Sequence, residues 1–127
     1  METSSFDDRS PIYQQIADRI KNDILSGALA EGDQVMSTNQ YAAFYRINPA
    51  TAAKGFHLLT EEGIVHKRRG IGMFVSDHAR ETLRDERRRR FFVEVLEPML
   101  AEAHVIGIPV AEIVQRIQAA RPSDGGR

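Results

Sequence analysis

The sequence predicts a mainly α-helical protein with a small β-hairpin wing, organised as an N-terminal winged helix-turn-helix and a C-terminal α-helical region. Three observations predict this fold class. Apolar residues recur at helical spacing along most of the chain, the second and third predicted helices are only two or three residues apart, and two β-prone runs flank a glycine-rich turn. We expect a disordered tail at 1–9, the winged domain at 10–77, the helical region at 78–121 and a second disordered tail at 122–127.

The first helix is expected to begin at Ser10 and Pro11, with the serine as N-cap and the proline at the first helical position, and to end at Gly27. Its apolar stripe consists of isoleucines spaced every four residues: Ile12, Ile16, Ile20 and Ile24. A connector over 28–36 follows, with a turn at 31–33.

The next two helices carry capping signals. Ser37 and Gln40 fit a capping box at the start of a short helix that runs through Tyr45. Asn48 and Pro49 then repeat the pattern of a cap followed by proline and open a third helix that closes at 61–63. Its buried face should consist of Ala52, Phe56 and Leu59.

The rest of the chain should form the wing and the C-terminal helices. Residues 64–75 are typical of a β-hairpin with a glycine-rich turn. From about Ala79 to Ile106 the pattern is helical again, and Pro98 is expected to kink or break this helix near Glu94. A last short helix is expected over 110–120.

Composition excludes several classes of protein. The chain has 127 residues, of which 42% are hydrophobic and 28% charged, and this balance is typical of a globular domain. No apolar run reaches the roughly 18 residues of a membrane-spanning helix, and the polar, acidic N-terminus is unlike a signal peptide, so we expect a cytoplasmic protein. Without cysteine, and with four histidines that are not spaced as metal ligands, the sequence predicts no metal, no cofactor and no enzyme.

The charge distribution points to a polyanionic partner. A formal net charge of −1 argues by itself against nucleic acid, but it averages unlike parts of the chain. Residues 36–76 contain five basic and two acidic residues, a net +3, whereas residues 1–35 have a net charge of −4. The middle third is therefore a basic island in a near-neutral protein.

The third helix of a winged helix-turn-helix lies in the major groove of DNA, and its N-terminal half reads base edges. The residues that can do so here are Asn48, Thr51 and Lys54, with the last two on one helical face. The small side chains of Ala50 and Ala53 allow this face of the helix to approach the base edges closely. For Asn48 a purely structural role as N-cap is the alternative, and the two roles are compatible.

The predicted wing carries the stronger signal. Lys67, Arg68 and Arg69 lie beside a turn with Gly70 and Gly72, whose glycines allow close approach of the backbone. Such a wing can insert arginine into the minor groove or lay it along the phosphates. The alternative is an ordinary basic turn in water.

Taken together, these segments resemble the GntR family of bacterial transcription regulators. The motifs that carry the resemblance are PIYQQI (11–16), ILSGAL (24–29), EGD (31–33), NPATAAK (48–54), EGIV (62–65) and RGIGMFV (69–75). The short helical remainder resembles the YtrA subfamily, whose members use a reduced two-helix region for dimerisation. The resemblance implies a dimeric, sequence-specific DNA-binding repressor or regulator.

Residue by residue, the resemblance carries DNA contact onto Ser37, Asn48, Thr51, Lys54, Arg69 and Gly70. The full predicted set adds Asn39, Lys67, Arg68 and Gly72. The sequence also departs from the family pattern. The usual Leu-Pro-Ser before the second helix is Val35-Met36-Ser37 here, and arginines common in the second and third helices correspond to Asn39, Pro49 and Ala53. We therefore expect a different operator, with more weight on Lys54 and the wing.

The C-terminal helices present more apolar surface than two helices can bury alone. The predicted dimer interface consists of Phe91, Phe92, Val95, Leu96, Met99, Leu100, Ala103, Ile113, Val114 and Ile117. A symmetric dimer predicts a palindromic operator with half-sites about 10 bp, or a multiple of it, apart. Alternatively, these helices fold back on their own winged domain.

Three further questions stay open at the level of sequence. The run Arg87–Arg90 suits a solvated face with surface ion pairs, a phosphate contact or a contact to a partner chain. A small-molecule effector would have to bind in a crevice between domains or chains, because two helices leave no room for a full ligand-binding domain. Finally, a winged-helix module that binds protein instead of DNA is the alternative to the regulator.

Overall fold

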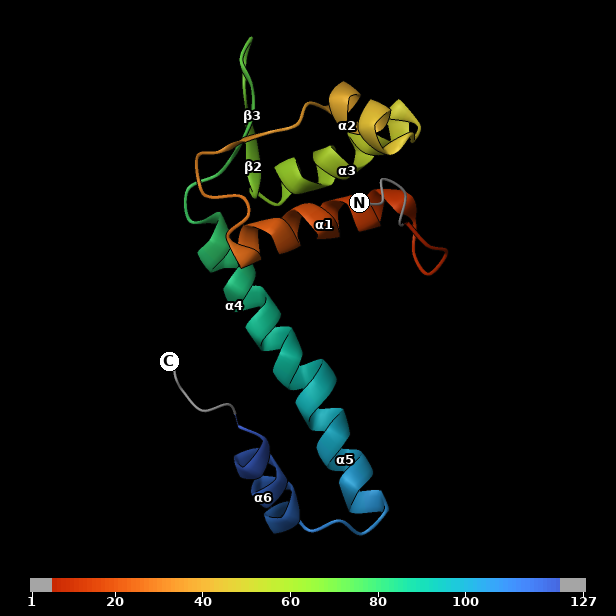
Figure 1. Ribbon diagram of the computed structural model, residues 1–127, viewed down its shortest axis with the longest axis vertical. Coiled ribbons are helices and arrows are strands. Elements are labelled where there is room, and N and C mark those ends of the chain that lie inside the picture. The colour runs from red at the N-terminus through yellow and green to blue at the C-terminus, as the bar shows by residue number, and fades with distance from the viewer. Residues whose placement is uncertain (1–5, 122–127) are drawn as a thin grey trace. The chain divides into compact units, whose positions relative to one another are not determined.

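The computed structural model describes residues 6–121 (Figure 1). They belong to two compact units, which are divided between Asp85 and Glu86. The predicted fold class is confirmed: helices dominate and a small sheet forms the wing. The N-terminal unit contains α1 (Ile12–Ser26), β1 (Gln34–Val35), α2 (Thr38–Tyr45), α3 (Pro49–Glu61), β2 (Val65–Arg68), β3 (Gly72–Val75) and the start of α4 (Ala79–Phe91). The C-terminal unit continues with a π-helical turn η1 (Phe92–Leu96), α5 (Glu97–Val105) and α6 (Val110–Ala120).

Helix α1 supplies one side of the N-terminal core. Ile16, Ile20 and Ile24 are buried, as their spacing predicts, and Gly27 ends the helix with a positive φ of 92°. The predicted N-cap is wrong by one residue. Pro11 occupies the cap with an extended ψ of 145°, and its carbonyl accepts the first helical hydrogen bonds.

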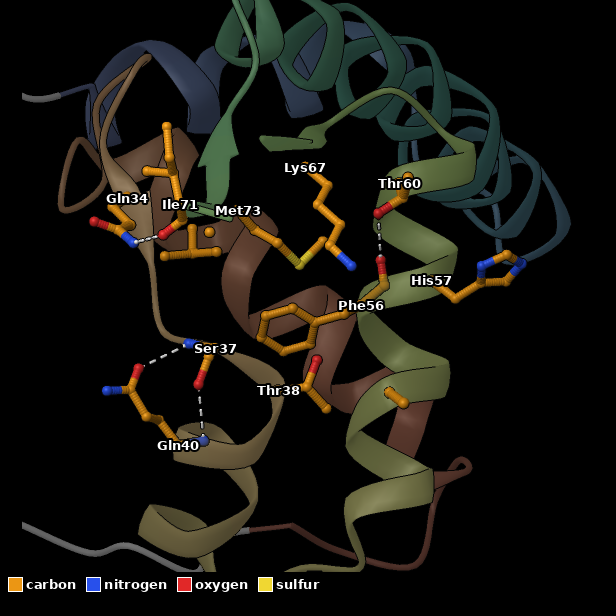
Figure 2. Close-up of a pocket in the computed structure, with 13 residues that line it drawn as sticks. Gln34, Ser37, Thr38, Gln40, Phe56, His57, Thr60, Lys67, Ile71 and Met73 are labelled. Atoms are coloured by element: carbon orange, nitrogen blue, oxygen red, sulfur yellow. Dashed lines mark hydrogen bonds between the residues drawn. The ribbon is translucent and has the colours of Figure 1, made fainter. Parts of the chain in front are cut away.

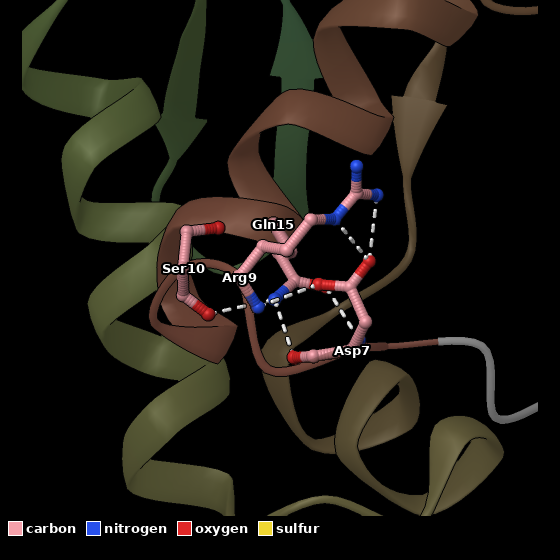
Figure 3. Close-up of polar contacts among 4 residues, drawn as sticks. All are labelled: Asp7, Arg9, Ser10 and Gln15. Carbon is pink, nitrogen blue, oxygen red and sulfur yellow. Dashed lines mark hydrogen bonds and ion pairs between the residues drawn. The ribbon is translucent and has the colours of Figure 1, made fainter.

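The sequence predicts a disordered tail over 1–9, of which residues 1–5 lie outside the described part, whereas residues 6–9 contact the rest of the N-terminal unit. Phe6 packs edge-on against Tyr45, with ring centroids 5.8 Å apart. Figure 3 shows the side-chain amide of Gln15 donating to the carbonyls of Asp7 and Ser10, at 2.8 and 2.7 Å. A side-chain hydrogen bond from Arg9 lowers the pKa of Asp7.

The caps of α2 and α3 form as predicted. The hydroxyl of Ser37 accepts from the backbone N–H of Gln40, and the side chain of Gln40 accepts from the N–H of Ser37, which completes the capping box. Asn48 caps α3 by accepting from the N–H of Ala50 at 2.7 Å. These caps fix where both helices begin, because they satisfy backbone donors that have no partner inside the helix.

The core lies between α1, α2, α3 and the sheet. Phe56, the largest fully buried side chain, packs edge-on against Tyr41 with centroids 5.5 Å apart. Burial, with the neighbouring Tyr45 as a lesser cause, raises the pKa of Tyr41 to about 12, so its hydroxyl stays neutral. Ala52 and Leu59 are buried on the same face of α3, as predicted.

The sheet has three antiparallel strands in the order β1-β3-β2, one more than the predicted hairpin. Val65 pairs with Val75 and Lys67 with Met73, while Gln34 and Val35 pair with the other edge of β3. The strand β1 was missed because two residues are too short to show any periodicity. It ties the connector after α1 to the base of the wing.

Helix α4 begins in the N-terminal unit, where Ala79 and Leu83 are buried in the core. The unit therefore extends to Asp85, whereas the sequence predicts that the winged domain ends at residue 77. The two boundaries differ because two isolated apolar residues within a charged helix give a weak signal in the sequence.

The predicted irregularity at Pro98 is found in the C-terminal unit, but the helical run is not broken there. Pro98 has no N–H to donate to the carbonyl of Glu94, and its ring would clash with that carbonyl in an α-helix. The backbone instead widens to a π turn, in which the N–H of Glu97 donates to Phe92 five residues earlier. The last helix, α6, has the predicted bounds.

Candidate nucleic-acid interface

One hollow of about 680 Å³ lies between α3, the start of α2 and the wing (Figure 2). Figure 2 shows the side chain of Lys67 reaching from β2 into the space between Met73 and α3. The lining residues are Gln34, Val35, Ser37, Thr38, Gln40, Ala53, Phe56, His57, Thr60, Lys67, Ile71, Gly72 and Met73. None of these is acidic, so the hollow is neutral to positive and suits a polyanion.

A second hollow of about 560 Å³ flanks the N-terminal half of α3 on the side of α1. The ammonium group of Lys54 lies 4.2 Å from the centroid of the Tyr13 ring, in cation–π contact. The lining residues are Ile12, Tyr13, Ile47, Asn48, Ala50, Thr51 and Lys54, again with no carboxylate.

The structure therefore divides the predicted DNA-binding residues between two edges of α3. Asn48, Thr51 and Lys54 share the hollow beside α1. The predicted residues Ser37, Lys67 and Gly72 line the hollow beside the wing. Ala50 and Ala53, which were expected on one face, line different hollows. Asn39 is exposed on the first turn of α2 and lies outside both.

The wing places its cations on different faces because side chains alternate along a strand. Lys67 faces the hollow, whereas the guanidinium of Arg68 lies on the other face, 4.8 Å from the ring centroid of Phe74. Arg69 and Gly70 form the exposed turn at the tip. The N–H of Ile71 donates to the carbonyl of Arg68 at 2.9 Å and closes this turn.

Gln34 braces the wing from outside the hairpin. Its side-chain amide donates to the carbonyl of Ile71 at 3.0 Å, across 37 residues of sequence (Figure 2). Gly72 makes this possible, because a Cβ at that position would collide with the Gln34 amide. The φ of Gly72, 143°, is also one that side chains with a Cβ rarely adopt.

Sequence reasoning missed Gln34, Tyr13 and His57 as parts of this surface. Gln34 and Tyr13 lie far from α3 in sequence, so only tertiary packing brings them to it. His57 is exposed one turn after Ala53 on the same side of α3, and its helical spacing from Ala53 was the one available signal.

Within residues 6–121 no group of three or more His, Cys, Asp or Glu side chains is placed to hold a metal ion. In the same part of the chain no helix is both long and apolar enough to cross a membrane.

The sequence pattern of the bacterial regulatory proteins of the gntR family matches residues 12–75, half of the chain. The chain belongs to the GntR family. This GntR protein is 32% identical over 109 residues to the HTH-type transcriptional repressor YtrA of Bacillus subtilis, covering 86% of its own length and 83% of YtrA. The predicted family, and its resemblance to YtrA, are thereby confirmed.

Solved structures agree with the fold of this GntR protein. A GntR family regulator from Listeria monocytogenes superposes with a TM-score of 0.73 at 26% identity, covering 91% of this chain and all of that one. A transcriptional regulator from Oenococcus oeni gives a TM-score of 0.79 at 25% identity, covering 91% and 94%. The relatives are transcriptional regulators and not enzymes, and the chain is a DNA-binding transcription regulator.

Proposed function

We propose that this GntR protein is a repressor that binds a palindromic operator as a homodimer, with α3 in the major groove and the wing against the adjacent backbone. Asn48 and Thr51 at the start of α3 read base edges, and Arg69 at the tip of the wing reaches the minor groove or its phosphates. A chromosomal operator places the protein in the cytoplasm.

The observation that carries this proposal is the arrangement of charge around α3. One cation, Lys54, stands at the edge of the helix beside α1, and another, Lys67, at the edge beside the wing. Both hollows lack carboxylates, so this face can approach a polyanion without burying like charges against it. The acidic excess of the chain lies in residues 1–35, which have a net charge of −4.

Dimerisation is proposed from the C-terminal unit. Its exposed apolar side chains include Phe91, Phe92, Val95, Met99, Leu100, Val114 and Ile117. Of the predicted interface residues, Leu96 and Ile113 are partly buried. Ala103 is buried within the single chain, so it packs the protomer itself and is not available to a partner. An exposed apolar surface of this extent is best covered by a second copy.

A titration of fluorescent genomic fragments with the purified protein tests the regulator, with selection of the bound fragments to find the operator. Binding should weaken steeply as salt rises, because phosphate contacts release counterions. Lys54→Ala should lose far more affinity than Arg88→Ala, whose guanidinium lies over the ring of Phe92 in the C-terminal unit. If no fragment is retained at low salt, the protein-binding alternative replaces this proposal.

A further inference from the structure

The ammonium group of Lys54, an exposed residue of α3, contacts the ring of a residue from another helix. Lysine side chains are long and flexible, and their ammonium group normally samples many positions in water. Here the group sits 4.2 Å above the Tyr13 ring, in the first turns of α1, where the negative face of the ring attracts it. Lys54 is therefore held against the α1 edge of α3.

The contact between Tyr13 and Lys54 depends on an unusually close approach of α1 and α3. A Cβ at Gly55 would lie 2.9 Å from the carbonyl oxygen of Tyr13 and 3.1 Å from Cβ of Ile16. Glycine inside a helix normally lowers its stability. We therefore interpret Gly55 as a residue that allows α1 and α3 to pack closely. Because Gly55 has no side chain, the backbone of α1 comes close enough for the Tyr13 ring to contact Lys54, the residue before Gly55 in α3.

The surroundings of this ammonium group suit a phosphate diester. Thr51 lies one turn before Lys54 on the same face, so the hollow beside the ammonium group is polar and uncharged there. Since no carboxylate lines the hollow, an anion entering it meets no like charge.

We propose that Tyr13 is a positioning residue for DNA binding, whose ring holds Lys54 at the edge of α3 so that its ammonium group takes a phosphate of the DNA backbone and not a base edge. This rests on the proposed function, because it assumes that this face of α3 meets DNA. It changes the role of Lys54 that the sequence suggested. Phosphate contacts set the register of a protein on DNA, whereas base contacts supply the specificity.

The first test compares Lys54→Met, which keeps the apolar stem, with the wild-type chain on operator and on unrelated DNA. A phosphate contact predicts that affinity for both DNAs falls by a similar factor. It also predicts that the slope of log K against log salt decreases by about one for each DNA-bound chain. A loss confined to the operator would overturn the proposal, because it would make Lys54 a base-reading residue.

The second test is a double-mutant cycle. Tyr13→Leu should weaken DNA binding about threefold per chain, and about tenfold for two bound chains, while Tyr13→Phe, which keeps the ring, stays close to wild type. In the Lys54→Met background Tyr13→Leu should cause no further loss. Equal losses in both backgrounds would overturn the positioning role.

Controls distinguish an unfolded variant, a failure of the proposed function and a failure of the inference about Tyr13. Circular dichroism and thermal unfolding check that each variant is folded, and Tyr13→Met, which fills similar space, replaces Tyr13→Leu if the latter unfolds. Wild-type protein that retains no DNA at low salt would refute the proposed function itself. Wild-type binding with unchanged affinity in Tyr13→Leu would refute only the inference about Tyr13.

Discussion

At the scale of single residues, Gly72 shows how the lack of a side chain allows a contact between the wing and the connector after α1. It has a φ of 143°, and it leaves the space that the Gln34 amide fills while donating to Ile71. We predict that Gly72→Ala destabilises the protein by roughly 1–3 kcal/mol, chiefly from backbone strain, because the flexible end of the Gln34 side chain can turn away from the new Cβ and loses only its hydrogen bond to Ile71. Urea unfolding measures the loss, and DNA binding should fall with it because the tip moves.

The matched control separates strain from collision. In a Gln34→Ala background the collision partner is gone, so Gly72→Ala should cost measurably less there than in the wild-type chain. Gly70→Ala, at a φ of 77° with no neighbouring atom within 4 Å of the new Cβ, should show strain without collision. Equal costs of Gly72→Ala in both backgrounds would show that Gln34 does not brace the wing.

At the scale of elements, the start of α3 combines a capping role with the proposed reading role, and one substitution separates them. Aspartate caps helices as well as asparagine does, and its charge is favourable at a helix N-terminus. We therefore predict that Asn48→Asp keeps the thermal stability of the wild-type chain but binds operator DNA at least tenfold more weakly, because a carboxylate replaces the amide at the base edge and adds a negative charge beside the DNA. Thermal unfolding and a binding titration measure the two effects.

The companion variant is Asn48→Ala, which loses the hydrogen bond to the N–H of Ala50. It should lower stability by about 1 kcal/mol, the usual effect of losing an N-cap. Unchanged DNA binding in Asn48→Asp would leave Asn48 a structural cap only, and α3 would then have to read DNA through Thr51 and its neighbours.

The elements that the sequence predicted well are those with local signals. The caps at Ser37 and Asn48, the stop at Gly27 and the buried stripe of α1 depend on residues within one or two turns, so short-range patterns are enough to find them. The candidate site is different. That Lys54 turns toward Tyr13 depends on how closely two helices pack, and no short-range pattern contains that information.

At the scale of the whole molecule, the proposal gives the two units different roles, DNA binding for the N-terminal unit and dimerisation for the C-terminal unit. The N-terminal unit carries both hollows and the wing, whereas the C-terminal unit carries exposed apolar side chains on its helices. A single reading head with one lysine in each hollow should bind DNA weakly. Joining two heads raises the effective concentration of the second one, so affinity for a palindromic site depends strongly on the dimer.

This dependence can be tested by placing two carboxylates in the proposed interface. The double variant Leu96→Asp and Leu100→Asp should be monomeric in sedimentation velocity, because burying aspartate between two chains without a partner is costly. Its operator affinity should fall roughly a hundredfold or more, while its weak binding to a single half-site persists. The control, Gln115→Asp with Gln118→Asp, adds the same charge at exposed polar positions of α6 and should stay dimeric. A dimer that survives the leucine substitutions would place the interface elsewhere, and a wild-type monomer would favour helices that fold back on their own winged domain.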